Sequence, residues 1–277
     1  RGRATCPPPL SCPARACHPE RMAARVDVNS DLGEGFGPWR MGDDEALLQV
    51  VTTASIACGF HAGDPVIMAR TVALARRHDV AVGAHPGHLD LYGFGRRQIS
   101  GQPPAELATL VVYQVGALGA IAARQGMRLG HVKLHGALSN AAAVDAALAA
   151  AVAEAISDLD PGLAWLVPSG SEMATAAERC GLRAVHEVFA DRGYDDAGDL
   201  LPRNRPGALL TDTGEVVERA LRIVEEGAVV SVSGRVLPLP CDSLCVHGDT
   251  PGALETARAL RAALEVAGVA VAAFSAS

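Results

Sequence analysis

Hydrophobic and polar positions alternate in a regular rhythm from Val26 onward. Short apolar runs rich in β-branched residues end in clusters of Gly, His, Asp or Asn, and a longer segment with helical spacing follows each run. This order is typical of βα units around a parallel sheet. The predicted strands lie near residues 26–30, 54–58, 80–84, 129–134, 163–167, 184–189, 228–233 and 243–247.

Three of the helical segments begin at clear start signals. In Asp64-Pro65 and Thr250-Pro251 a capping residue precedes proline at the first helical position, and Pro103-Pro104 opens an apolar stretch that continues to Arg124. No Gly-x-Gly-x-x-Gly turn follows the first strand, so a dinucleotide-binding sheet is disfavoured. We therefore expect an α/β fold, a TIM-like (β/α) barrel with seven or eight parallel strands.

Length and composition place this barrel in a single soluble domain. The chain has 277 residues, which fits one catalytic barrel over residues 22–277. Residues 1–21 are rich in Arg, Pro, Cys and Ala and lack the apolar segment of an export signal, so they predict a disordered tail or an upstream extension. No apolar run approaches the roughly 20 residues of a membrane span, and a cytoplasmic location is expected.

The charge balance favours small molecules as ligands. The net charge is −7 and no block of Lys or Arg is present, which argues against nucleic acid or an anionic membrane surface as a partner. The histidines are concentrated where barrel enzymes carry their chemistry, at the strand ends. Four of the nine, His61, His85, His135 and His247, lie at or just after predicted strand ends.

Two predicted strands carry a fully polar face, because side chains alternate along a strand. The members of these faces are Asp27, Asn29 and Asp31 on one strand and His131, Lys133 and His135 on the other. A polar face must be solvated or paired, and the mouth of a barrel provides both conditions.

Lys133 is distinguished by composition, since it is the only lysine among 24 Lys and Arg residues. A lysine is a compact charge whose pKa shifts readily on burial, which suits contact with a phosphate or carboxylate, or proton transfer. The alternative is a chance survivor in an Arg-rich composition.

Other polar positions have competing interpretations. Asp64 is better explained as a helix cap than as a catalytic acid, because Pro65 follows it. Arg96 and Arg97 fit a solvated turn and an anion clamp equally well. Asp249 is free for binding if Thr250 caps the next helix.

Three polar residues accompany the predicted strand at 184–189. Glu187, Asp191 and Arg192 fit functional roles better than a surface ion pair.

Polar and glycine-rich motifs occur at seven places, namely 27–37, 56–64, 83–87, 94–97, 131–136, 187–194 and 245–249. Their order and spacing resemble the LamB/YcsF family over about residues 25 to 273. Two positions depart from the family's usual pattern: Leu134 stands where Pro is usual, and Ser139 where Tyr is usual.

The resemblance implies a barrel related to the glycoside hydrolase/deacetylase group. It also implies an ATP-dependent 5-oxoprolinase activity that opens the lactam of 5-oxoproline to L-glutamate together with separate B and C subunits. An unstrained five-membered lactam closes readily, so its hydrolysis needs a driving force, which phosphorylation of the amide oxygen would supply. The chain has no Gly-x4-Gly-Lys-Ser/Thr loop, so ATP would be held by other means or by a partner subunit.

On this hypothesis Asp31 or Glu187 positions or deprotonates water, and His61, His85 and His135 transfer protons near the lactam. Lys133 would stabilise developing negative charge or hold the substrate carboxylate. The candidate substrate-binding residues are Asn29, Arg96, Arg97, Asp191, Arg192, His247 and Asp249.

Two other functions stay open from the sequence. A metal-dependent carbohydrate deacetylase is one, because Asp31, His61, His85 and His247 could supply ligands at a barrel mouth. No metal is assigned from the sequence. The other is a subunit that binds the lactam without catalysis, while its partners break the bonds.

Overall fold

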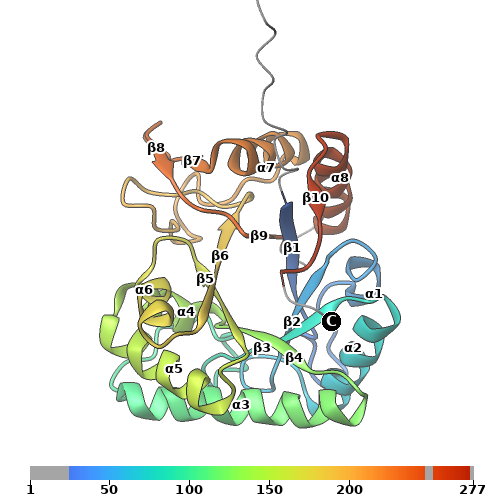
Figure 1. Ribbon diagram of the computed structural model, residues 1–277, viewed down its shortest axis with the longest axis vertical. Helices are drawn as coiled ribbons and strands as arrows, with labels where there is room; N and C mark the ends of the chain where they lie inside the picture. The colour runs from blue at the N-terminus through green and yellow to red at the C-terminus, as the bar shows by residue number, and fades with distance from the viewer. Residues whose placement is uncertain (1–24, 247–251, 275–277) are drawn as a thin grey trace, which may run out of the picture.

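The computed structural model describes residues 25–246 and 252–274, and its centre is a closed barrel of seven parallel strands (Figure 1). The strand order around the barrel is β1-β2-β3-β4-β5-β6-β9, and pairing of β9 with β1 closes it. The predicted α/β barrel is therefore confirmed. The strands are β1 Arg25–Leu32, β2 Thr53–Ala57, β3 Ala81–His85, β4 Leu129–Lys133, β5 Ala164–Pro168, β6 Arg183–Phe189 and β9 Ser243–Cys245.

Helices cover the outside of the barrel. Asp64 caps α2 by accepting hydrogen bonds from two backbone N–H groups, and Pro65 takes the first helical position, as predicted. Helix α3 begins at Pro104, also as predicted, whereas the predicted start at Thr250-Pro251 lies outside the described residues. The helices are α1 Asp44–Leu47, α2 Pro65–Arg77, α3 Pro104–Arg124, α4 Gly136–Val144, α5 Ala146–Leu159, α6 Glu172–Arg179, α7 Thr213–Glu226 and α8 Ala253–Val266.

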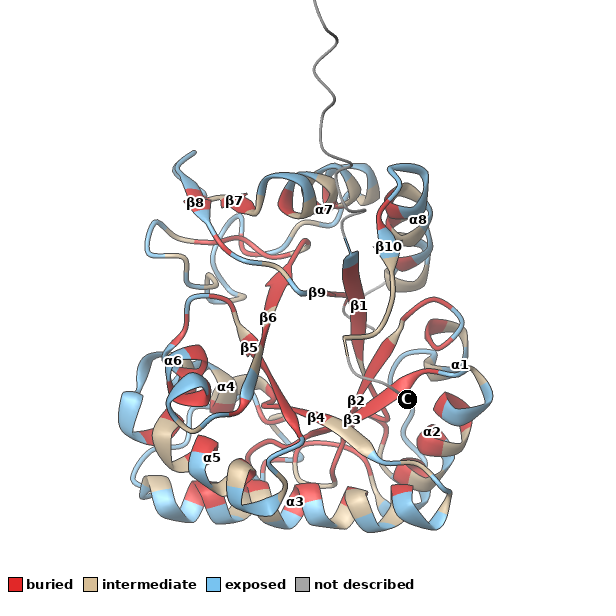
Figure 2. Cartoon of the chain, viewed as in Figure 1, coloured by how far each residue is buried: buried red, intermediate tan, exposed pale blue. Residues whose placement is uncertain are grey.

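The apolar core lies between the strands and the helices. Figure 2 shows the barrel strands largely buried, while the helices expose their outer faces. Val28 and Val132 belong to one large apolar cluster that also contains Val72 of α2 and Leu118 of α3. Because neighbouring side chains on a strand alternate, this outward apolar set leaves the polar positions of the same strands facing the barrel interior.

The prediction that residues 228–233 form a strand of the barrel is wrong. β7 Ala228–Val230 pairs antiparallel with β8 Val236–Pro238 in a separate two-stranded sheet. Between them the chain turns through Gly234, whose φ of 89° favours glycine. A short β-rich run predicts a strand but does not distinguish a hairpin from a parallel barrel strand. A further strand, β10 Ala270–Val271, was not predicted and pairs with the first residues of β1.

Helix α3 corrects the expectation that no apolar run approaches the length of a membrane span. By length and composition this 21-residue helix, with mean hydropathy 1.5, could cross a membrane, and the sharply bent pair α4–α5 passes the same test when taken together. In the fold, α3 packs against α5 and β3. Its buried positions include Leu107, Val111, Val115 and Leu118, which recur at helical spacing. Packing in the fold accounts for the 39% of this apolar stretch that is buried.

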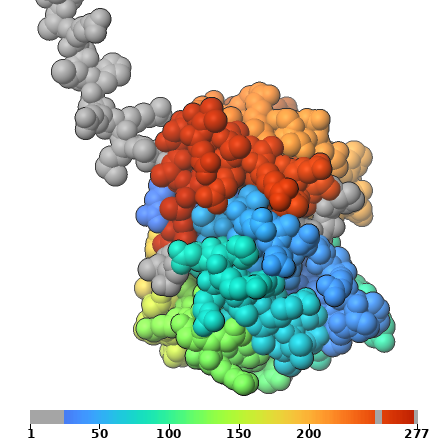
Figure 3. All heavy atoms as spheres, turned by 90° about the vertical axis from the view of Figure 1, so that its right-hand side faces the viewer, coloured from blue at the N-terminus to red at the C-terminus, as the bar shows by residue number. Residues whose placement is uncertain are grey.

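The end of the chain packs beside its beginning. Figure 3 shows the C-terminal segment, in red, lying against the blue and cyan segments that follow β1. Arg261 of α8 donates a hydrogen bond from Nη1 to the backbone carbonyl of Val50 at 2.5 Å, and α8 also contacts α1. These contacts complete the ring of helices at the place where β9 and β1 close the barrel.

Candidate functional site

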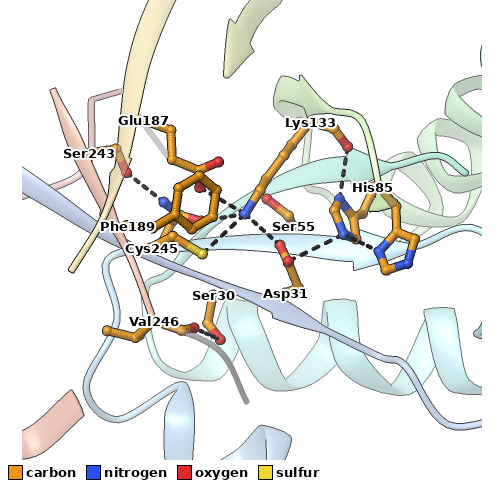
Figure 4. A network of polar contacts seen from close by, with 12 residues as sticks. Ser30, Asp31, Ser55, His85, Lys133, Glu187, Phe189, Ser243, Cys245 and Val246 are labelled. Carbon is orange, nitrogen blue, oxygen red and sulfur yellow. Dashed lines mark hydrogen bonds and ion pairs between the residues drawn. The ribbon is translucent and has the colours of Figure 1, made fainter. Parts of the chain in front are cut away.

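The ammonium group of Lys133 lies between two carboxylates at the carboxyl end of the barrel (Figure 4). Its Nζ atom is 2.8 Å from Asp31 Oδ1 and 2.8 Å from Glu187 Oε1. Nζ also donates to Asn29 Oδ1 at 3.1 Å and lies 3.3 Å from Cys245 Sγ. These partners come from β1, β6 and β9, so closure of the barrel assembles the group.

Burial makes the charges of this group depend on one another. The Lys133 side chain is 6% exposed and that of Glu187 is 2% exposed. Burial by itself lowers the pKa of Lys133, but the neighbouring carboxylates of Asp31 and Glu187 outweigh it and hold that pKa well above its usual value. Burial likewise raises the pKa of Asp31, but His85 and Lys133 hold it well below its usual range. At neutral pH, Lys133 is therefore protonated and Asp31 is ionised.

A second polar layer beneath this group orients Asn29. The Asn29 amide donates from Nδ2 to Ser243 Oγ at 2.7 Å, and the Ser243 hydroxyl in turn donates to Asp27. Asp27 also accepts hydrogen bonds from the hydroxyl groups of Thr52, just before β2, and Thr53, the first residue of β2. Burial raises the pKa of Asp27, and these hydrogen bonds oppose the rise. The predicted shared face of Asp27, Asn29 and Asp31 is confirmed, with Asp27 at its inner end.

His131 shares the face of Lys133, as predicted, but its side chain lies buried inside the barrel. Its Nε2 atom is 3.0 Å from Ser55 Oγ, and burial lowers its pKa to about 3. The ring lies directly over Gly83 of β3, where a Cβ atom would stand 2.2 Å from the imidazole. Glycine at that position is what leaves room for His131.

Four side chains beside the lysine form what we call the histidine cluster: Glu34, His61, His85 and His135. Glu34 Oε1 is 3.4 Å from His61 Nε2 and 3.5 Å from His135 Nδ1. His85 Nε2 is 2.9 Å from His135 Nδ1, and the rings of His61 and His135 stack with centroids 3.7 Å apart. Asp31 Oδ2 lies 3.3 Å from His85 Nε2 and so connects the cluster to the lysine group.

Glu34 is the member of this cluster that the sequence interpretation did not select. It lies in the loop after β1, two residues beyond Leu32, where strand alternation no longer gives a direction for side chains. Its position inside the glycine-rich motif at 27–37 was the available signal.

Parts of the lysine group and of the histidine cluster form one wall of a cavity of about 600 Å³. Asp31, His85, Lys133, His135 and Glu187 line this wall. Residues 198–204 and α4 also line the cavity, including Ser139, one of the two positions that depart from the family's usual pattern. A cavity of this volume fits a small ligand.

The structure separates the two arginines that the sequence paired. Arg96 lines the cavity, with its guanidinium 4.9 Å from the centroid of the Phe94 ring. Arg97 instead forms an ion pair with Asp90 and is not among the lining residues. The ion pair of Arg97 with Asp90 stabilises the local loop, whereas Arg96 is positioned to contact a ligand.

Of the two residues predicted after β6, only one lines the cavity. Arg192 lines the cavity but donates from Nε to the Ala208 carbonyl at 3.2 Å and from Nη2 to the Leu201 carbonyl at 2.6 Å. Its guanidinium therefore holds the loop of residues 198–204, which lines the cavity. Asp191 is not among the lining residues, while Arg203, which was not predicted, is. The predicted binding residues His247 and Asp249 lie outside the described residues.

This arrangement is suited to hydrolysis at a polarised carbon. It combines carboxylates that can orient water, imidazoles that can carry protons, and arginines for an anionic ligand. Together with its place at the carboxyl ends of the strands, it defines the class as a (β/α)-barrel hydrolase.

The chain belongs to the LamB/YcsF family, whose model matches residues 26–277. It is 53% identical over 251 residues to the 5-oxoprolinase A subunit of Rhodopseudomonas palustris, covering 91% of this chain and 99% of that protein. It is 52% identical over 249 residues to a 5-oxoprolinase A subunit of Bradyrhizobium diazoefficiens, covering 90% and 97% respectively.

A solved structure with the same fold is the lactam utilization protein of Thermus thermophilus. The TM-score is 0.85 and the sequence identity is 46%, and the match covers 90% of this chain and 100% of that one. The fold, the family and the relatives therefore agree.

Proposed function

We propose that this chain acts as the A subunit of an ATP-dependent 5-oxoprolinase, which opens the lactam of 5-oxoproline to L-glutamate together with B and C subunits. The near-complete match to proteins of that name supports the proposal. The observation that carries it in the structure is the buried Asp31–Lys133–Glu187 group on the wall of a ligand-sized cavity.

The chemistry of the lactam explains why ATP is consumed. Transfer of the γ-phosphoryl group to the amide oxygen makes the ring carbon more electrophilic and gives ADP. Water then adds to this carbon, and the C–N bond breaks as the nitrogen takes up a proton, which leaves an acyl phosphate. A second water hydrolyses the acyl phosphate to glutamate and inorganic phosphate.

The residues of the cavity wall fit the water-addition and ring-opening steps. Asp31 and Glu187 accept hydrogen bonds from water and orient it toward the carbon. The carboxylate that takes a proton from this water can return it to the departing nitrogen.

The positively charged residues of the cavity have two different roles. Lys133 is already bound by two carboxylates, so it holds them in place rather than binding the ligand. Arg96 and Arg203 provide the positive charge that meets the substrate carboxylate or the phosphoryl group. ATP is bound by a partner subunit on this proposal, since the sequence carries no phosphate-binding loop of the Gly-x4-Gly-Lys-Ser/Thr type.

Reconstitution tests the proposal. The chain is mixed with its candidate B and C subunits, and ATP-dependent release of glutamate from 5-oxoproline is measured with each component omitted in turn. Glutamate release should require every component. A complete mixture that releases no glutamate would contradict the proposal.

Two variants separate catalysis from simple binding of the lactam. Asp31→Asn should lower the rate of glutamate formation at least about 100-fold, because it removes a charge that faces the reacting water. Asp158→Asn, an exposed position on α5, is the matched control and should keep the full rate. Full activity of the Asp31→Asn variant would assign bond breaking to the partner subunits.

A further inference from the structure

Hydrogen bonds fix the ring nitrogens of two members of the histidine cluster. His85 Nδ1 lies 2.8 Å from the Lys133 carbonyl oxygen, and His135 Nε2 lies 2.8 Å from the Phe94 carbonyl oxygen. A carbonyl oxygen only accepts, so each of these nitrogens carries the proton. When both rings are neutral, the lone-pair nitrogens are therefore His85 Nε2 and His135 Nδ1.

These two lone pairs face each other at 2.9 Å. Two acceptors at hydrogen-bond distance repel unless a positive charge lies between or beside them. Both rings are buried, His85 with 1% and His135 with 4% of its surface exposed. A metal cation satisfies both nitrogens at once.

His61 and Glu34 point further donors at the same place. His61 is 1% exposed, and neither of its ring nitrogens has a hydrogen-bond partner among the described residues, although Nε2 contacts Glu34 at 3.4 Å. One donor atom from each of the four cluster residues lies within 4.8 Å of all the others. A buried imidazole is rarely left in this condition without a partner, and a metal ion is one such partner.

We infer that Glu34, His61, His85 and His135 bind one divalent transition-metal ion of the zinc class. Three imidazole nitrogens and a carboxylate oxygen are ligands that suit Zn²⁺ better than Mg²⁺, which prefers oxygen. The backbone carbonyls that accept the outer N–H groups of His85 and His135 hold these rings in the orientation typical of metal-binding histidines.

One adjustment accompanies binding. The rings of His61 and His135 are parallel, with an interplanar angle of 3°, so their lone pairs do not converge until one ring tilts. The Phe94 carbonyl holds His135 at Nε2, whereas His61 has no hydrogen bond among the described residues to resist the tilt. His61 is therefore the ligand that moves.

The inference does not depend on the proposed function, because binding is measured without any lactam. The full chain is dialysed against a chelator, transferred to chelator-free buffer and titrated calorimetrically with Zn²⁺, and separately with Mg²⁺. Wild-type protein should bind one Zn²⁺ per chain, at least about 100-fold more tightly than Mg²⁺. Co²⁺ bound in place of Zn²⁺ should show the visible absorption of a site with nitrogen ligands.

Variants locate the ion. His61→Gln and Glu34→Gln should each weaken Zn²⁺ binding at least about 10-fold. His88→Gln is the matched control, a buried histidine in the loop after β3 that lies outside the cluster, and it should bind like wild type. Circular dichroism and the urea midpoint of each apo variant show that the chain is folded.

Two results would overturn the inference. One is Zn²⁺ binding that persists unchanged in both His61→Gln and Glu34→Gln. The other is no stoichiometric ion in the wild-type chain together with a far-downfield imidazole proton shared by His85 and His135, which would make the short contact a proton bridge.

Discussion

Replacement of Lys133 by methionine tests whether its ammonium group holds two buried carboxylates in place. The substitution keeps the length of the side chain and removes a cation 2.8 Å from both Asp31 and Glu187. Glu187 is 2% exposed, so it must remain ionised in a dry site or take up a proton. Taking up the proton costs about 1.4 kcal/mol for each pH unit above about 4.3, the pKa of an ordinary glutamate.

The expected loss of stability follows from that figure. It is about 3.7 kcal/mol at pH 7 and about 1.6 kcal/mol at pH 5.5. The value at pH 7 lies within the range of about 3–5 kcal/mol for breaking a buried ion pair. The sign follows because a carboxyl group that is protonated in the folded variant favours folding at low pH and loses this contribution as the pH rises.

Urea unfolding of wild type and Lys133→Met at pH 5.5 and pH 7 measures the difference. The variant should lose about 2 kcal/mol more at pH 7 than at pH 5.5, relative to wild type. Adding Glu187→Gln to Lys133→Met should remove most of this pH dependence, and Arg96→Met, which removes an exposed cation of the same cavity, should show none. A pH-independent loss in Lys133→Met, or no effect of the added Glu187→Gln, would refute the reasoning.

Three further predictions concern the barrel interior and the arginines. Because burial lowers the pKa of His131 to about 3, its neutral ring stabilises the fold above about pH 6.5 and this contribution is lost as the pH falls toward 3. The fall in unfolding free energy from pH 7.5 to pH 5 should therefore be about 2 kcal/mol smaller in His131→Asn than in wild type, and an equal fall would contradict the pKa. Gly83→Ala should lower the free energy of unfolding by about 1–3 kcal/mol, seen as a lower melting temperature, because its methyl group meets the His131 ring; an unchanged temperature would show that the ring can move. In the reconstituted enzyme, Arg96→Ala should raise KM for 5-oxoproline about 10-fold while Arg97→Ala, which loses only the contact with Asp90, changes it less than about 3-fold; equal effects would refute the separation of the two arginines.

The sequence was sufficient for the fold class and for one half of the site. Strand periodicity and the polar strand ends predicted a barrel whose chemistry lies at the carboxyl ends of its strands. Alternation within single strands put Asn29 on the face of Asp31 and His135 on the face of Lys133, and the structure confirms both faces. These inferences succeed because side-chain direction within a strand depends on local geometry alone.

Several features required pairing between distant segments. The partners of Lys133 come from β1, β6 and β9, which the order of the sequence does not bring together. Residues 228–233 have the pattern of a strand, yet they pair with β8 outside the barrel. The sequence pattern shows that this segment tends to be extended. Which strand it pairs with depends on which strand edge is available in the folded protein.

The sequence and the tertiary structure therefore each account for part of what is known about Lys133. Its uniqueness among the basic residues and its place beside the histidines were visible in the sequence. Its actual environment, a buried ammonium held between Asp31 and Glu187, exists only once the barrel closes. Burial and proximity set the charge of such a group, and both are properties of the tertiary structure.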